Sequence, residues 1–145
     1  MSKSKAAIIA SLDAFTRGYI ECMLWSSTDE SNEQGGEPLD ANYDEDDLTV
    51  DSLRDIVSVC QDFQQAQAAL LEAAYKPKEW IAEKQQFDKP DYDAAHAGHD
   101  FWLTRNGHGA GFWDRGLAQG DALTKAAKVY GECHPMVHRR KIIVQ

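Results

Sequence analysis

Apolar side chains recur at helical spacing in two long segments of the first half of the chain. Between residues 6 and 25 this spacing predicts one amphipathic helix with a wide apolar stripe. A second helix is predicted from Asp51 or Ser52 as far as Ala74, with Thr49 and Asp51 as candidate N-caps. The stripes comprise Ile8, Ile9, Leu12, Phe15, Tyr19, Ile20, Cys22 and Met23, and then Leu53, Ile56, Val57, Cys60, Phe63, Leu70 and Leu71.

Two prolines divide the middle of the chain. Pro77 ends the second helix or opens a short helix that carries Trp80 and Ile81, because proline is tolerated only in the first turn of a helix. Pro90 separates this segment from the next element, which is predicted to be a helix over residues 91–102. The prolines therefore mark element boundaries and not helix interiors.

Glycine and β-branched residues shape the last third of the chain. Four glycines between residues 107 and 116 argue against a continuous helix and favour a structured loop or short hairpin. A last helix is predicted over 123–130, with Gly131 as its C-cap. The β-branched run at 142–144 favours a strand, and a strand needs a partner. The best candidates for that partner are residues 101–104 and 111–114.

These elements predict a mainly α (α+β) fold in a single domain over residues 1–145. The 145 residues suit one hydrophobic core and are too few for two ordinary domains. We expect about four helices, with a small sheet or hairpin near the C-terminus. The stretch at about 26–50 is rich in serine, asparagine, glycine and proline, and we expect it to form a mobile acidic loop.

The negative charge of the chain is concentrated in one segment. The formal net charge is −9, and ten carboxylates with no lysine or arginine lie between Asp29 and Asp51. The remainder is close to neutral, which argues against nucleic-acid binding through a general basic surface. A small basic cluster lies near the end of the chain, at 138–141; it binds a phosphate, pairs with the acidic segment or is simply solvated.

The cysteines and the hydropathy profile indicate an intracellular protein. Cys22, Cys60 and Cys133 are widely spaced and form no CxxC pair, which favours reduced thiols. No window approaches the roughly 18 consecutive apolar residues of a membrane span. Asp13 and Arg17 interrupt the N-terminal apolar patch too early for a secretory signal. We therefore expect no contact with a membrane.

The run AAHAGHDFWLTRNGHGAGFWDRG, residues 94–116, is the most distinctive part of the sequence. It combines three histidines, four large aromatic residues, two arginines and two aspartates with five glycines. Imidazole and carboxylate groups at this density suit a divalent metal or a general acid–base pair. The spacing matches no metal signature, because HxxHD lacks the i, i+4 histidines and the glutamate of HExxH. The candidate catalytic residues are His96, His99, Asp100, His108 and Asp114.

The same run has a second interpretation, in which its aromatic residues form a core patch and its polar residues bind turn backbone groups. Two Phe-Trp pairs, at 101–102 and 112–113, place neighbouring side chains in different directions. We expect both phenylalanines to be buried and at least one tryptophan to be partly exposed beside an arginine, as an interface anchor. The candidate partner-binding residues of this run are Trp102, Arg105, Trp113 and Arg115.

The runs GHDFWLTRNGHGAGFWDRGL, GDALTKAAKVYGE, YIECMLWSSTDE and GEPLDANYDEDDL together cover most of the chain. In these runs the sequence resembles a family of small uncharacterised proteins encoded by tailed bacteriophages and prophages. The end, HPMVHRRKIIVQ, departs from the family pattern, in which a further strand with an acidic turn is expected. The resemblance implies a non-structural protein in the cytoplasm of an infected bacterial cell. It carries no activity and no catalytic or ligand residue.

Part of the acidic segment has the alternating spacing of a calcium-binding loop. Asp40, Asn42, Asp44 and Asp46 occupy alternate positions, and Asp51 falls at position twelve. Position six is a glutamate in place of the required glycine, and position twelve is not the bidentate glutamate. We therefore expect neither a metal nor another cofactor here, and favour a solvated helix entrance or a negative patch that attracts a basic partner.

Three functions from different classes are compatible with these features, one of them a passive structural or assembly protein that no feature specifically supports. The favoured one is an accessory protein that binds a host protein or defence complex through an acidic, DNA-mimicking surface and inhibits nucleic-acid processing. No direct contact with nucleic acid is expected. The alternative is a small metal-dependent or acid–base hydrolase that uses the histidines and aspartates of 96–114. The candidate residues of the acidic surface are Asp40, Asp44, Glu45, Asp46 and Asp47.

Overall fold

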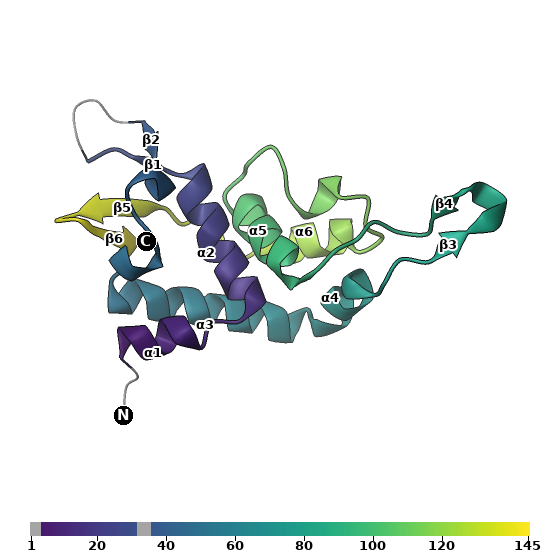
Figure 1. Cartoon of the computed structure of the whole chain (residues 1–145), viewed down its shortest axis with the longest axis horizontal. Helices are drawn as coiled ribbons and strands as arrows, with labels where there is room; N and C mark the ends of the chain where they lie inside the picture. Colours follow the sequence, from purple (N-terminus) through teal and green to yellow (C-terminus); the bar gives the residue numbers. More distant parts are fainter. Residues whose placement is uncertain (1–3, 32–35) are drawn as a thin grey trace.

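The computed structural model describes residues 4–31 and 36–145, which form an α+β domain (Figure 1). Within these residues, six α-helices and three two-stranded antiparallel sheets are present. The helices are α1 (Lys5–Ala10), α2 (Ala14–Ser26), α3 (Val50–Ala66), α4 (Ala68–Tyr75), α5 (Ala94–Arg105) and α6 (Gly120–Lys128). The sheets pair β1 (Thr28–Asp29) with β2 (Glu37–Pro38), β3 (Trp80–Ile81) with β4 (Gln86–Phe87), and β5 (Pro135–His138) with β6 (Lys141–Val144). Short 3₁₀ helices are η1 (Leu39–Ala41), η2 (Glu45–Asp47), η3 (Ala82–Lys84) and η4 (Phe112–Asp114).

The crossing of α2 and α5 is the centre of the fold. Gly18 of α2 faces the backbone of Ala95, and Gly98 of α5 faces the backbone of Phe15 and Tyr19. A Cβ atom at either glycine would clash with a backbone carbonyl oxygen of the other helix. The absence of two Cβ atoms therefore lets the two helices approach each other closely.

Aromatic side chains from three helices fill the core around this crossing. Phe63 of α3 stacks on Phe101 of α5, with 4.2 Å between ring centroids. Phe15 and Tyr19 of α2 lie 5.9 Å and 5.5 Å from the Phe101 ring, and Tyr19 meets Trp102 edge to face at 5.3 Å. Such tilted and edge-to-face pairs are the preferred aromatic geometries and add to the free energy gained by burial.

The two long predicted helices are each broken in the structure. The segment 6–25 divides into α1 and α2 because Asp13 caps a new helix, with its carboxylate accepting a hydrogen bond of 2.8 Å from the Thr16 amide. The second helix divides at Gln67 into α3 and α4. Thr49 is confirmed as the N-cap of α3, and α4 ends before Pro77.

The C-terminal hairpin β5–β6 confirms the predicted sheet near the C-terminus but not its pairing. Residues 101–104 lie in α5, and 112–114 form η4, so neither candidate segment pairs with the last strand. Its partner is the preceding strand β5, through a two-residue turn of Arg139 and Arg140. Strand β6 also contacts the acidic segment, because the amide of Thr49 donates to the carbonyl of Ile142 at 3.1 Å.

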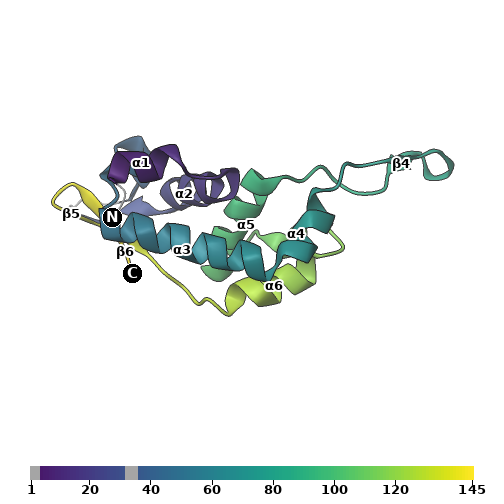
Figure 2. The same ribbon diagram turned by 90° about the horizontal axis from the view of Figure 1, so that it is seen from below.

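One of the two predictions for the segment after Pro77 was a short helix that carries Trp80 and Ile81. The structure has the hairpin β3–β4 there instead. Figures 1 and 2 show that it projects from the end of the molecule opposite to β5–β6. Trp80 and Phe87 are exposed and pack edge to face at 5.1 Å, and the Lys78 ammonium lies 4.2 Å from the Phe87 ring centroid. These contacts between its own side chains stabilise the hairpin.

The segment predicted as a loop at about 26–50 contains β1, β2, η1 and η2 in its described residues, while residues 32–35 lie outside the description. It is anchored by Leu39 and Leu48, both fully buried. The amide of Leu39 also donates to the carbonyl of Ser27 at 2.9 Å. The backbone of the acidic residues is therefore fixed to the core on both sides of η2.

The cysteines are free and buried, in agreement with the predicted reduced thiols. Burial raises the pKa of Cys22 to about 12 and raises that of Cys60 as well, so both thiols stay protonated at neutral pH. Among the helices of residues 4–31 and 36–145, none is long and apolar enough to cross a bilayer.

Replacing Gly98 by alanine tests the helix crossing. In an isolated helix the change would be favourable by roughly 0.5–1 kcal/mol, but here the new Cβ clashes with the Phe15 carbonyl. We expect Gly98→Ala to lower the free energy of unfolding by about 3 kcal/mol in a urea titration followed by circular dichroism. Gly109→Ala is the control, because no heavy atom lies within 4 Å of a Cβ there. An unchanged midpoint for Gly98→Ala would disprove the close crossing.

Candidate functional site

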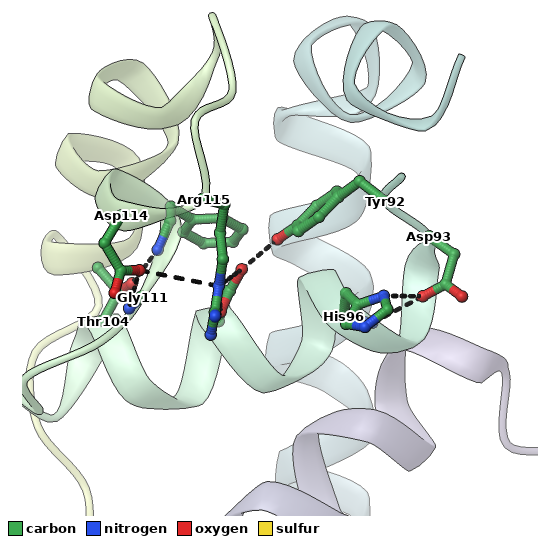
Figure 3. Close-up of polar contacts among 9 residues, drawn as sticks. Tyr92, Asp93, His96, Thr104, Gly111, Asp114 and Arg115 are labelled. Atoms are coloured by element: carbon green, nitrogen blue, oxygen red, sulfur yellow. Dashed lines mark hydrogen bonds and ion pairs between the residues drawn. The ribbon is translucent and has the colours of Figure 1, made fainter. Parts of the chain in front are cut away.

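Asp100 is fully buried, and its carboxylate is bound by one cation and one neutral hydroxyl group (Figure 3). Arg115 donates to its carboxylate through Nη2 at 2.7 Å and Nε at 3.0 Å, and the Tyr92 hydroxyl donates at 2.5 Å. The hydrogen bond with Asp100 raises the pKa of Arg115, and burial beside this carboxylate raises the pKa of Tyr92. Asp100 therefore joins α5 to the segments before and after it, and its carboxylate is closed to solvent.

Asp114 and Thr104 hold the glycine turn that follows α5 (Figure 3). The Asp114 carboxylate accepts a hydrogen bond of 3.1 Å from the amide of Gly111, and the Thr104 hydroxyl accepts one of 3.2 Å from the amide of Phe112. A side chain at Gly111 would clash with Thr104 and with the Trp113 ring. These contacts satisfy turn backbone groups, as the second interpretation of the run predicts.

The three histidines of the run point to different neighbours. His96 pairs through Nδ1 with Asp93 at 2.9 Å in the first turn of α5, whereas His99 lies 3.8 Å from Glu21 of α2. His108 lines a separate surface pocket beside Trp102. Asp100 and Asp114 share Arg115, which fills the space between them with a cation.

The five candidate catalytic residues thus do not converge on one open point. In the part of the chain that the structure describes, no group of three or more histidine, cysteine or carboxylate side chains could hold a metal ion. This includes the calcium-like spacing of the acidic segment, where Asn42 donates to Glu37 at 2.9 Å. The geometry therefore does not bring these five residues together in one site.

The aromatic pairs divide between core and surface. Phe101 and Phe112 are fully buried, as predicted. Trp102 is only 1% exposed and donates from its indole nitrogen to Ser26 at 2.8 Å, so it is a core residue and not a contact residue. Trp113 is 40% exposed. It is the tryptophan of this run that a partner can reach.

Arg105 is engaged within the fold. Its guanidinium donates to the carbonyls of Gly131 and Tyr130, at 2.8 Å and 3.1 Å, and to the hydroxyl of Tyr19 at 3.2 Å. It therefore binds backbone carbonyls just beyond the C-terminal end of α6. Arg115 is likewise engaged by Asp100, so both guanidinium groups make contacts within the fold.

A surface pocket of about 520 Å³ lies between the acidic segment and the two central helices. Trp25, a tryptophan that is 66% exposed, lines this pocket together with Tyr43 from the acidic segment. The pocket therefore combines aromatic faces with carboxylates and one imidazole. We call it the acidic–aromatic pocket, and it is lined by Glu21, Leu24, Trp25, Asp40, Tyr43, Asp44 and His99.

The carboxylates continue from this pocket into a neighbouring one. Glu21 and Leu24 line both pockets, and Glu45 lines the second. Within residues 4–31 and 36–145, the ion pairs involve none of the acidic residues from 40 to 47. We define the acidic face as Glu21, Asp40, Asp44, Glu45 and Asp46.

The backbone of η2 is held in place by its own carboxylates. Asp44 accepts a hydrogen bond of 2.9 Å from the amide of Asp46, and Asp47 accepts one of 2.9 Å from the amide of Asp44. Lys5 donates to the carbonyls of Asp46 and Leu48 and so ties η2 to α1. The acidic face is therefore presented on an ordered backbone.

The sequence pattern did not identify Glu21, Trp25 and Tyr43 as site residues. A signal for two of them was present, because Glu21 and Trp25 are four residues apart in α2 and fall outside the apolar stripe of that helix. Tyr43 and His99 join them only through tertiary structure. No sequence spacing connects residues from three separate elements.

No known protein-family model, curated protein or solved structure matches this chain. The resemblance to small phage proteins therefore stays a prediction. The function is inferred from the geometry of the acidic face.

The two tryptophans of the central run provide a test of their assignment to core and surface. Trp102→Ala removes a buried ring that packs on Tyr19, and we expect it to lower the free energy of unfolding by about 3–5 kcal/mol. Trp113→Ala, the matched change at a partly exposed ring, should cost far less. Urea unfolding of both variants measures the difference, and equal losses would place both rings in the core.

Arg115→Met tests whether the ion pair between Asp100 and Arg115 stabilises the fold. The substitution leaves the buried Asp100 carboxylate without its cation, and we expect a loss of about 3 kcal/mol in the free energy of unfolding. His96→Ala removes an exposed polar side chain of the same helix and should change stability by no more than about 0.5 kcal/mol. A neutral Arg115→Met would show that the pair does not support the fold.

Proposed function

We propose that this protein binds a partner protein through its acidic face and occupies the basic groove in which that partner binds nucleic acid. One observation carries the proposal: Trp25, 66% exposed, stands in a pocket among the carboxylates of Glu21, Asp40 and Asp44. A large exposed aromatic ring is the side chain type that most often anchors an interface. Carboxylates around it favour a partner surface rich in lysine and arginine.

The charge distribution supports a groove that normally holds nucleic acid. Such grooves carry clusters of lysine and arginine that contact phosphates. The acidic face offers several carboxylates without ion-pair partners in the described chain, on a backbone fixed by η2. Charges of this kind steer a basic partner and compete with nucleic acid for the same side chains.

The proposed partner is a host protein or defence complex in the bacterial cytoplasm. This choice of partner depends on the resemblance to phage-encoded proteins. The choice of the acidic face as the contact surface depends on the geometry of its residues. The two parts are separable, because a basic nucleic-acid-binding groove occurs in many classes of protein.

A charge-neutralised variant tests the acidic face. Asp40→Asn, Asp44→Asn, Glu45→Gln and Asp46→Asn together remove four charges, while asparagine at position 44 keeps an N-cap side chain. We expect this variant to capture the partner from bacterial lysate at least about tenfold less well than wild type. We also expect a labelled duplex to compete with the wild-type protein for the captured partner, and salt to weaken the complex.

The matched control removes four exposed carboxylates outside the face, by Glu72→Gln, Glu83→Gln, Asp121→Asn and Glu132→Gln. It should capture the partner as wild type does. Equal capture by the acidic-face variant would refute the acidic-face mechanism. Capture that a nucleic-acid duplex leaves unchanged would refute occupation of a nucleic-acid groove.

A further inference from the structure

The turn between β5 and β6 presents two arginines in an unusual backbone conformation. Arg139 and Arg140 have φ values of 51° and 62°, in the left-handed region. Two-residue hairpin turns of this type strongly prefer asparagine and glycine, because other residues are strained there. The chain thus carries two long cationic side chains where small residues would fit better.

These two arginines have no partner within the described chain. Their side chains are exposed, and neither takes part in a hydrogen bond or ion pair with another described residue. His138 and Lys141 on either side are exposed as well. Figures 1 and 2 show the β5–β6 turn at one extreme end of the molecule, directed away from its body.

The acidic–aromatic pocket has the chemistry that binds a guanidinium group. Trp25 and Tyr43 offer aromatic faces, on which a planar guanidinium can stack. Glu21, Asp40 and Asp44 offer carboxylates that accept charge-assisted hydrogen bonds from it. The pocket and the turn are therefore complementary in charge and in the chemical groups that they present.

We infer that the 138–141 turn of one molecule docks in the acidic–aromatic pocket of a second copy of this chain. The turn projects from the body of its own molecule (Figures 1 and 2), and its arginines have no partner within the described residues, so the contact lies between two copies. The inference goes beyond the proposed function and gives that function a form of regulation. Because the same carboxylates serve both contacts, self-association and binding of a basic partner exclude each other.

The turn can be altered without loss of the hairpin. Arg139→Asn with Arg140→Gly removes both cations and supplies the residues that this turn prefers. We expect wild type to associate with increasing concentration in sedimentation velocity at low salt. We expect the turn variant to stay monomeric at the same concentrations while its melting temperature is unchanged or higher. The control, Lys125→Gln with Lys128→Gln, removes two exposed cations of α6 and should associate as wild type does.

Mixing two defective variants tests the contact directly. A pocket variant, Trp25→Ser with Asp44→Asn, keeps an intact turn, and the turn variant keeps an intact pocket. Each should be monomeric alone, and an equimolar mixture should form a one-to-one complex, because one intact turn then meets one intact pocket. A mixture of two variants that both carry an altered pocket should not associate, because neither molecule then has an intact pocket.

A wild-type protein that is monomeric at every concentration at low salt would overturn the inference. Association of the turn variant as strong as that of wild type, or no complex in the mixture, would overturn it as well. All these measurements use the purified chain alone. Their failure is therefore distinguishable from failure of the proposed function, which is measured on a captured partner.

Discussion

The close approach of α2 and α5 is the constraint on which the rest of the structure depends. Gly18 and Gly98 remove the two Cβ atoms that would hold the helices apart. Phe15 and Tyr19 can then reach Phe101 and Trp102 across the crossing, and Phe63 completes the aromatic core. A wider separation would open cavities between large rings, which is costly because protein interiors tolerate little empty space.

The acidic–aromatic pocket is a consequence of this crossing. The α2 helix buries one face against α5 and leaves Glu21 and Trp25 on its outer side, while α5 brings His99 within 3.8 Å of Glu21. Buried Leu39 and Leu48 then hold the acidic segment against the same region. Three segments far apart in sequence thus build one pocket, and both this apolar packing and the hydrogen bonds of Asp44 hold it in place.

The sequence predicted local features better than tertiary ones. Periodicity and capping residues located the helical regions, and the cap at Thr49 was correct, because these signals depend on neighbours along the chain. The β5–β6 turn was missed because Arg139 and Arg140 lack the asparagine and glycine that usually mark such a turn. The histidines and aspartates of 96–114 are close in sequence, but packing assigns them to separate contacts. Nothing local showed that Asp100 would be buried beneath Tyr92 and Arg115.

Seven of the ten carboxylates of the acidic segment fall into two groups. Asp29, Asp44 and Asp47 accept backbone hydrogen bonds, and Asp51 lies in the first turn of α3, where a negative charge is favourable. These groups support the fold. Asp40, Glu45 and Asp46 are exposed to solvent to different degrees and make no such side-chain contact within the described residues, although Lys5 lies beside Asp46 and Arg17 lines a pocket with Glu45. The side chains of these three groups are thus not used by hydrogen bonds of the fold, and a cationic surface outside the domain can reach them.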